Sequence, residues 1–359
     1  MRLFTCSSCG NLLYFENVAC LQCNSELGFV PEERLLDVIT PFDKNGSGYI
    51  LAANEKSYRK CRNYYKHAVC NWMIDAAENE EFCIACQLNR TIPNLSIEKN
   101  KDLWNKLEIE KRRLVFSLLQ LGLDVRSKNK HPNGLAFDFL ADHGENFSER
   151  DRVMTGHDDG LITINIAEAD PVQREKMRTS MEEHYRTILG HFRHESGHYY
   201  WDQLIKNTDD LREYRDIFGD ESQDYSAALD RHYKEGPPDD WKEHFVSVYA
   251  SSHPWEDWAE SWAHYLHIMD TLETAYSFGI HIEPRTLNGD DLAVKISFSP
   301  YMERDFNTIF EHWLSVSFAL NSLNRSMGHA HAYPFVISPS VVTKLDFIHK
   351  IILKNTERI

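Results

Sequence analysis

The chain has 359 residues, of which 42% are hydrophobic, and a formal net charge of −16. This length is enough for a large core and for two or three domains. The negative charge argues against a protein that grips nucleic-acid phosphates, because that mode of binding needs clustered Lys and Arg. No apolar run reaches the roughly 18 residues of a membrane helix, and the chain starts without the apolar core of a signal peptide. We therefore expect a cytoplasmic protein that acts away from membranes.

The eight cysteines all lie within the first 86 residues, and the remaining 273 residues have none. Oxidised secreted proteins more often spread their cysteines along the chain, so this confinement indicates metal binding in a reducing compartment. The two knuckles Cys6-x-x-Cys9 and Cys20-x-x-Cys23 are typical of a site that gives four thiolates to one tetrahedral zinc. Four thiolates close the coordination shell, so we expect a structural zinc there, in preference to the iron of rubredoxin-like sites.

A third knuckle, Cys83-x-x-Cys86, has less regular partners. We expect Cys61 and Cys70 to complete a second structural zinc site, because eight cysteines divide into two sets of four. In the alternative, Cys61 is a free buried thiol and His67 is the fourth ligand.

The cysteine pattern also sets the expected domains. Residues 1–40 form a zinc ribbon and residues 41–95 a second four-cysteine zinc module, with Pro41–Gly48 as a turn or short linker between them. Such small modules bury too little apolar surface to fold alone, and they use zinc as a nucleus. Residues 1–100 hold ten Lys/Arg and twelve Asp/Glu, so they carry no basic surface for DNA or RNA. A protein partner, or a role in shaping a cleft, is the better interpretation.

From about Ile97 the pattern becomes helical, with leucines recurring at helical spacing. The segment Leu161–Ile166 alternates β-branched residues and predicts a strand. Asp170 and Pro171 then predict the start of helical sequence that continues to about Ile205 with one break. Further helices are expected at 221–234, 255–277 and 301–323. The expected fold is therefore α+β and mainly α-helical, with a catalytic domain over 96–359 whose C-terminal helical part spans 300–359.

The central motif is His194-Glu195-x-x-His198, within the expected helix 183–205. Positions i and i+4 lie about 40° apart around a helix, so both imidazoles can reach one zinc. Glu195 would act as general base on a zinc-activated water and then carry the proton to the leaving amine. Gly197 indicates close backbone packing beside these ligands. The alternative is a chance match in a chain with 18 histidines, but large flanking residues and the upstream strand favour a real site.

The third zinc ligand must come from elsewhere in the chain. The metzincin extension is absent, because Trp201 occupies its Gly position and Leu204 its last His position. The expected helix 255–277 carries acidic and histidine side chains on one face, namely Glu256, Glu260, His264 and His267. The alternative is that the two acids are charges favoured by the helix dipole.

An HExxH helix followed by a second helix with a Glu, and an acid four residues later, resembles the gluzincin class that includes thermolysin. The resemblance implies that Glu256 is the third ligand and that Glu260 orients a ligand histidine through its free ring N–H. Glu260 is the substitute ligand if Glu256 does not bind. Some gluzincins are similar in placing a tyrosine just ahead of this helix, which implies that Tyr249 stabilises the oxyanion. Tyr249 is otherwise an ordinary core tyrosine.

Longer motifs resemble a narrower family, bacterial zinc-binding metallopeptidases with an N-terminal zinc ribbon. The matching segments span most of the chain and are the paired Cys motifs, CNW at 70–72, LNRTIPNLS at 88–96, GLAFDFLAD at 134–142, ITINIAEAD at 162–170, HFRHESGHYYW at 191–201 and HPWEDWAESWAHYLHIMDTLETA at 253–275. The resemblance implies a peptidase-like catalytic domain and no particular substrate.

The sequence thus predicts a zinc metallopeptidase with one catalytic and two structural zinc ions, acting on a peptide or protein. Two alternatives stay open: a hydrolase of a non-peptide amide, and an inactive zinc-ribbon module that binds protein. His329 and His331, in GHAHAYPF, either border the site or lie on the surface. No feature of the sequence predicts an oligomeric state.

Overall fold

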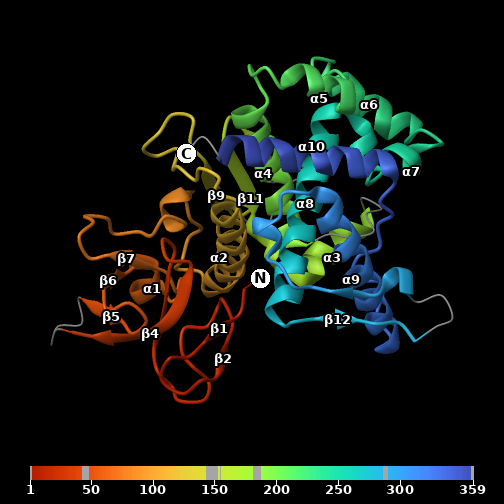
Figure 1. Cartoon of the computed structure of the whole chain (residues 1–359). Helices are drawn as coiled ribbons and strands as arrows, with labels where there is room; N and C mark the ends of the chain where they lie inside the picture. Colours follow the sequence, from red (N-terminus) through yellow and green to blue (C-terminus); the bar gives the residue numbers. More distant parts are fainter. Residues whose placement is uncertain are drawn as a thin grey trace. The chain divides into compact units, whose positions relative to one another are not determined.

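The computed structural model describes residues 2–42, 48–142, 153, 155–180, 187–285 and 290–356. The chain divides into two compact units, shown in Figure 1. The first unit is Met1–Gln120 with Asp124–Ser180, and the second is Leu121–Leu123 with Met181–Ile359. Across the described ranges, no helix has both the length and the apolar character needed to cross a bilayer.

The first unit opens with a two-stranded sheet and a five-stranded sheet, both antiparallel. Strands β1 (Phe4–Thr5) and β2 (Leu12–Leu13) form the first. The second has the order β3-β4-β5-β6-β7, with β3 (Leu27–Val30), β4 (Leu35–Pro41), β5 (Tyr49–Leu51), β6 (Ser57–Lys60) and β7 (Met73–Asp75), and the short helix α1 (Arg62–His67) precedes β7.

The segment expected as a turn, Pro41–Gly48, connects β4 to β5, and its residues 43–47 lie outside the described residues. Since β4 pairs with β5, one sheet holds strands from either side of residue 40. The domain boundaries expected from the sequence (1–40, 41–95 and 96–359) stay a prediction.

A four-stranded mixed sheet and a long helix complete the first unit. The sheet has the order β10-β11-β9-β8, with β8 (Asn89–Thr91), β9 (Ala136–Leu140), β10 (Gly156–Asp158) and β11 (Leu161–Asn165), preceded by the 3-10 turn η1 (Cys86–Leu88) and the helix α2 (Glu98–Gln120). The expected strand is β11, and it ends one residue early because the Asn165 side chain caps the 3-10 turn η3 (Ile166–Ala169). Helix α3 (Pro171–Ser180) begins at the expected proline, where Asp170 Oδ1 accepts the Val172 N–H at 3.0 Å.

The core of the first unit joins α2 to the cysteine-rich region. Phe116 of α2 packs against Phe15 and Phe29, with ring centroids 5.1 and 5.8 Å apart. Trp72 lies 4.8 Å from Phe29 on the same cluster. All four rings are buried. The cysteine-rich segment therefore shares its apolar core with α2, which follows it in sequence. The helix adds apolar area that the small segment could not bury by itself.

The second unit is built from helices. They are α4 (Ile188–Leu204), α5 (Leu211–Phe218), α6 (Tyr225–Glu235), α7 (Trp241–His244), α8 (Pro254–Ser277), α9 (Phe306–Ser326) and α10 (Pro339–Thr356), with 3-10 turns η4 (Tyr249–Ser252), η5 (Asp290–Leu292) and η6 (Pro300–Met302). A small hairpin, β12 (His281–Ile282) with β13 (Val294–Lys295), lies between α8 and α9. Helix α8 packs beside α4, and α10 and α9 also lie on α8. The chain as a whole is a mixture of α-helix and β-strand.

Side-chain caps explain where the expected helices start late. The helix expected over 221–234 begins at Tyr225, because the Asp224 carboxylate accepts the Ala227 N–H. The helix expected over 301–323 begins at Phe306, since Asp305 caps it. The helix expected over 255–277 agrees to within one residue. The expected zinc helix 183–205 starts at Ile188 after the cap Thr187, and residues 181–186 lie outside the described residues.

Helices α4 and α8 approach each other most closely at Gly197. A Cβ atom added there would lie 2.9 Å from the Ala259 Cα and 3.2 Å from Trp262. Two indole N–H groups of α8 also bind α4: Trp258 Nε1 donates to the Gly197 carbonyl at 2.9 Å, and Trp262 Nε1 donates to Ser196 Oγ at 3.2 Å. The close packing predicted from Gly197 is therefore present, between α4 and α8.

This contact predicts that Gly197→Ala destabilises the chain. Overpacking against a backbone atom costs about 1–3 kcal/mol, whereas alanine regains about 1 kcal/mol of helix propensity, so we expect a net loss of up to about 2 kcal/mol. Urea unfolding of wild type and variant measures this difference. The matched control is Gly156→Ala, because a Cβ added at Gly156 meets nothing within 4 Å. Equal stability of Gly197→Ala and wild type would contradict the packing argument.

Candidate metal centres

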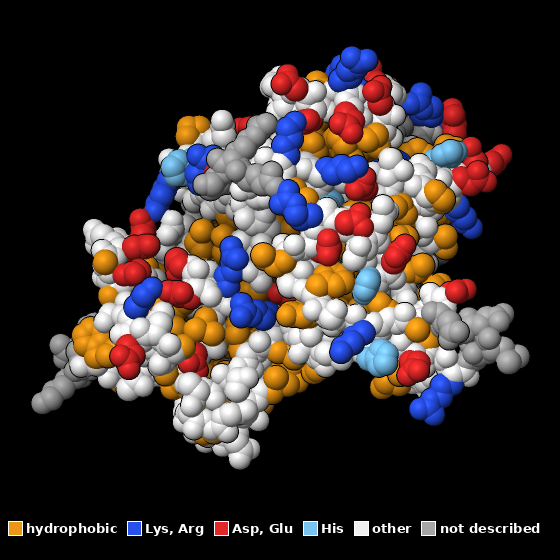
Figure 2. Space-filling model, in the orientation of Figure 1, with side chains coloured by type: hydrophobic (Ala, Val, Ile, Leu, Met, Phe, Trp, Pro, Cys, Tyr) orange, Lys and Arg blue, Asp and Glu red, His pale blue; other side chains and the backbone are white. Residues whose placement is uncertain are grey.

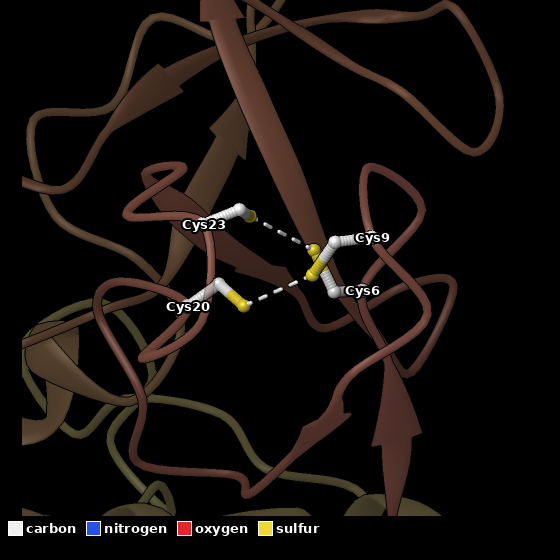
Figure 3. A group of neighbouring side chains, drawn as sticks. All are labelled: Cys6, Cys9, Cys20 and Cys23. Atoms are coloured by element: carbon white, nitrogen blue, oxygen red, sulfur yellow. Dashed lines mark hydrogen bonds between the residues drawn. The ribbon is translucent and has the colours of Figure 1, made fainter.

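The four side chains of the first cysteine cluster lie close together, as Figure 3 shows. The sulfur atoms of Cys6 and Cys23 lie 3.7 Å apart, and those of Cys9 and Cys20 lie 3.6 Å apart. Sulfurs on a tetrahedral zinc lie about 3.8 Å from one another for Zn–S bonds of about 2.3 Å. A disulfide would need about 2.05 Å. The four thiols therefore fit one zinc ion and are not paired as disulfides.

The second cluster contains Cys61, Cys70, Cys83 and Cys86, all of them buried. Sulfur of Cys70 lies 3.8 Å from both Cys83 and Cys86. The Cys83 backbone N–H donates to Cys61 Sγ at 3.4 Å, a bond that stabilises a thiolate. His67 instead packs its ring edge against Trp104, 5.9 Å away. The arrangement thus brings Cys61, and not His67, to the other three sulfurs.

The third cluster joins α4 to the first turn of α8. His194 and His198 lie one turn apart on α4, and Glu256 follows Pro254, the first residue of α8. Glu256 Oε2 lies 3.0 Å from His194 Nε2 and 3.4 Å from His198 Nε2. Ligand atoms about 2.1 Å from a tetrahedral zinc are about 3.4 Å apart. The three side chains therefore converge at the spacing of ligands on one ion.

The two oxygens of Glu256 have different surroundings. Oε2 faces the histidines, whereas Oε1 accepts a hydrogen bond from the Tyr225 hydroxyl at 2.5 Å. Glu256 is 1% exposed. Burial raises the pKa of its carboxyl, but His198 and His194 more than reverse this and hold the pKa well below its ordinary value. Glu256 is therefore a carboxylate at neutral pH, the form that binds a metal.

Glu260 contacts the other side of His194. Its Oε1 lies 2.7 Å from His194 Nδ1, and its Oε2 accepts a hydrogen bond from Ser247 Oγ at 2.6 Å. Nδ1 of His194 therefore donates to Glu260, and Nε2, which faces Glu256, is the nitrogen left to bind a metal. Of the two acids considered as third ligand, Glu256 lies with the histidine Nε2 atoms and Glu260 lies behind them.

Glu195 lies beside the converging ligands and is held by His191. His191 Nε2 is 3.2 Å from Glu195 Oε1, one helical turn away on α4. Burial raises the pKa of the Glu195 carboxyl, and the hydrogen bond with His191 and the charges of His194 and His198 outweigh it, so the pKa is lowered. Glu195 is therefore ionised and able to accept a proton.

Tyr249 and the histidines outside the cluster lie at different distances from it. The Tyr249 ring is 5.9 Å from the His194 ring and borders the site. His253 caps α8, since its Nδ1 accepts the Trp255 N–H at 3.1 Å. His264 is buried against Phe335, with rings 4.4 Å apart. His329 and His331 are exposed, and neither is among the groups of possible ligands found in the described part of the chain.

Two buried ion pairs hold α8 in place. Lys344 of α10 donates from Nζ to Asp257 Oδ2 at 2.6 Å, directly after the candidate ligand Glu256. Burial raises the pKa of Asp257 to about 7, and Lys344 opposes that rise. Arg193, next to His194, pairs with Asp270, which also accepts a hydrogen bond from Tyr301 at 2.6 Å. Both helices that supply candidate ligands are therefore fixed by charges as well as by packing.

Sequence reasoning missed Tyr225, Ser247 and His191. Each contacts a site carboxylate, yet each belongs to a residue type that is common in the chain. Of the three, only His191 could have been predicted, because its i, i+4 spacing from Glu195 is visible in the sequence. The other two come from α6 and from the loop before η4, and no local pattern marks them.

Two known sequence families match the chain. Residues 100–351 match the sequence model of a family described as "Putative zinc-binding metallo-peptidase", and residues 3–97 match a zinc-ribbon domain. The chain belongs to this metallopeptidase family. Uncharacterized proteins of Mycobacterium tuberculosis and Mycobacterium bovis are 42% identical to it over 354 residues, 98% of this chain and 95% of theirs. No solved structure matches the chain.

The two cysteine sites of this metallopeptidase-family chain differ in exposure, which predicts different rates of zinc loss. Cys9 is exposed and Cys23 is partly exposed, whereas the second cluster is fully buried. An organomercurial thiol reagent should therefore release zinc in two phases, a fast one from the first site and a slow one that requires unfolding. A coloured zinc indicator follows the release, and Cys9→Ser should remove the fast phase. Simultaneous loss of both ions would contradict the assignment.

Proposed function

We propose that the chain is a zinc-dependent metallohydrolase of the gluzincin type that cleaves peptide bonds. The observation that carries the proposal is the convergence of His194 Nε2, His198 Nε2 and Glu256 Oε2, with the oxygen 3.0 and 3.4 Å from the two nitrogens and ionised Glu195 beside them. Three protein ligands leave one coordination position open, which is typical of catalytic rather than structural zinc sites.

Each side chain has a role that follows from its contacts. Zinc, when bound, polarises the substrate carbonyl and lowers the pKa of water. Glu195 accepts the proton of the attacking water and delivers it to the leaving amine nitrogen. His191 holds the Glu195 carboxylate through Oε1, and Glu260 holds His194 through Nδ1.

Tyr249 is proposed as the group that stabilises the oxyanion of the tetrahedral intermediate. Its ring borders that of His194. Burial, more than any neighbouring charge, raises the pKa of its hydroxyl above the usual value. The phenol therefore stays protonated at neutral pH and can donate a hydrogen bond.

The two four-cysteine sites are proposed to hold structural zinc ions in a cytoplasmic protein, which gives three zinc ions per chain with the catalytic one. A nucleic-acid partner is not part of the proposal. On the face seen in Figure 2, basic and acidic side chains are intermingled, in keeping with the net charge of −16. The intact Glu195–His191 contact favours an active enzyme over an inactive binding module.

The first test replaces the proposed base. Glu195→Gln keeps the shape of the side chain but cannot take a proton, so cleavage of a peptide library should fall by at least about 100-fold while three zinc ions are retained. The control is His194→Ala, which should lose one zinc ion and all cleavage. Absence of cleavage by the wild-type chain would overturn the peptidase proposal in favour of a non-peptide amide substrate or an inactive module.

The second test concerns Tyr249. Loss of one oxyanion donor typically lowers kcat by about 10²–10³-fold, so Tyr249→Phe should show that loss with little change in KM or zinc content. Steady-state kinetics on a peptide found in the library screen measures both constants. An unchanged kcat would remove Tyr249 from the catalytic machinery.

A further inference from the structure

The position of Tyr225 indicates how Glu256 is presented to a metal. A carboxylate can bind zinc through one oxygen or through both. Glu256 Oε2 lies 3.0 and 3.4 Å from the two histidine Nε2 atoms, and Oε1 accepts the Tyr225 hydroxyl at 2.5 Å. Because Glu256 is 1% exposed, bulk water cannot readily replace the phenol as the partner of Oε1. The hydrogen bond from Tyr225 therefore engages Oε1 and leaves Oε2 to face the histidines.

The phenol is held in place from two directions. Tyr225 is the first residue of α6, whose start is capped by the Asp224 carboxylate at 2.9 Å from the Ala227 nitrogen. His253 accepts the Trp255 N–H on Nδ1, so its proton is on Nε2, which donates to the Gln223 carbonyl at 3.3 Å. This contact ties the segment before Tyr225 to the start of α8.

Ring contacts reinforce the same placement. The Tyr225 ring meets the rings of His253 and Trp255 edge-on, at 5.3 and 5.8 Å. Edge-to-face packing is a favoured arrangement of aromatic rings, so both contacts stabilise this orientation of the phenol. The phenol thus reaches Glu256 from a defined position and not from a loose surface loop.

The direction of the hydrogen bond follows from the charges. Ionised Glu256 has no proton to give, so the single proton of the Tyr225 hydroxyl goes to Oε1. Tyr225 is therefore the donor and Glu256 the acceptor of this bond.

We propose that Tyr225 is a positioning residue that keeps Glu256 a one-oxygen ligand and so leaves the fourth coordination position of the metal open. The proposal rests on the proposed function, because it presupposes a metal on His194, His198 and Glu256. Without the phenol, Oε1 is free to turn toward the metal and to raise its coordination number, at the position that a catalytic site reserves for water.

The test compares Tyr225→Phe with wild type in the full chain. The exchangeable third ion is first removed with a chelator that leaves both four-cysteine sites loaded, and zinc affinity is then measured by competition with that chelator. Loss of a second-sphere partner typically weakens metal binding by about 10–100-fold, and we expect a loss in that range. Cobalt(II) added in place of zinc should give a weaker visible absorption band in the variant, because five-coordinate cobalt absorbs less than tetrahedral cobalt.

The matched control is Tyr233→Phe, the same change about two turns further along α6 at a side chain that is 72% exposed. It should keep wild-type zinc affinity and cobalt spectrum. The His194→Ala chain supplies the spectral background of the cysteine sites, and thermal unfolding checks that each variant is folded.

Three results would overturn the proposal. Wild-type affinity and spectrum in Tyr225→Phe would show that the phenol does not control the ligand. An equal loss in Tyr233→Phe would assign the effect to α6 as a whole. A wild-type chain that holds only two zinc ions would remove the third site, and the proposed function with it, whereas the first two results leave that function intact.

Discussion

The close packing of α4 on α8 is the constraint on which the candidate catalytic site depends. Two of its ligands come from one helix and the third from the other, so the distance between the helices sets the distance between the ligand atoms. Gly197 lies between the two histidines and has no Cβ to keep α8 away. The indole N–H groups of Trp258 and Trp262 bind α4 on that side and resist sliding of one helix along the other. Zinc–ligand distances lie within about 0.2 Å of their standard values, so side chains from two helices can share one ion only if the helices keep a fixed separation.

The two units contain candidate metal sites of different kinds. In the first unit, sulfur clusters sit among short strands of two to seven residues, and the apolar core depends on help from Phe116 of α2. Zinc supplies folding free energy where little apolar area is available. In the second unit, long helices bury large aromatic side chains such as Trp258 and Trp262, and charged side chains such as Glu256 and Asp257 are buried as well. A packed core of this kind can keep the side chains of His194, His198 and Glu256 converging.

The sequence predicted those parts of the site that depend on local spacing. His194 and His198 are one turn apart in any helix, and the two cysteines of each knuckle are close together in any tight turn, so the groups that the fold brings together agree with the expectation. The pairing of Glu256 and Glu260 with the two sides of His194 came from resemblance to known enzymes. The roles of all these residues stay predictions.

Features that depend on tertiary placement could not be predicted. Tyr225 reaches Glu256 only because α6 returns to the start of α8, and nothing in its neighbourhood distinguishes it from the other tyrosines among the 16 in the chain. Helix α5 was not expected, and the five-stranded sheet was not expected either, because its strands are short and their apolar alternation is weak. Two helices begin later than the apolar pattern predicted, because the side chains of Asp224 and Asp305 cap the backbone at later positions.

The buried pair of Lys344 and Asp257 links the site to the order in which the chain is made. Asp257 follows Glu256 directly, and its charge is compensated by a lysine 87 positions later, on the last helix of the described chain. A buried carboxylate without its cation costs several kcal/mol, so the first turn of α8 gains its full support only once α10 has been synthesised and has docked. The histidines leave the ribosome long before that. The start of α8, with Glu256 on it, is therefore fully stabilised beside the two histidines only after the last helix has been made.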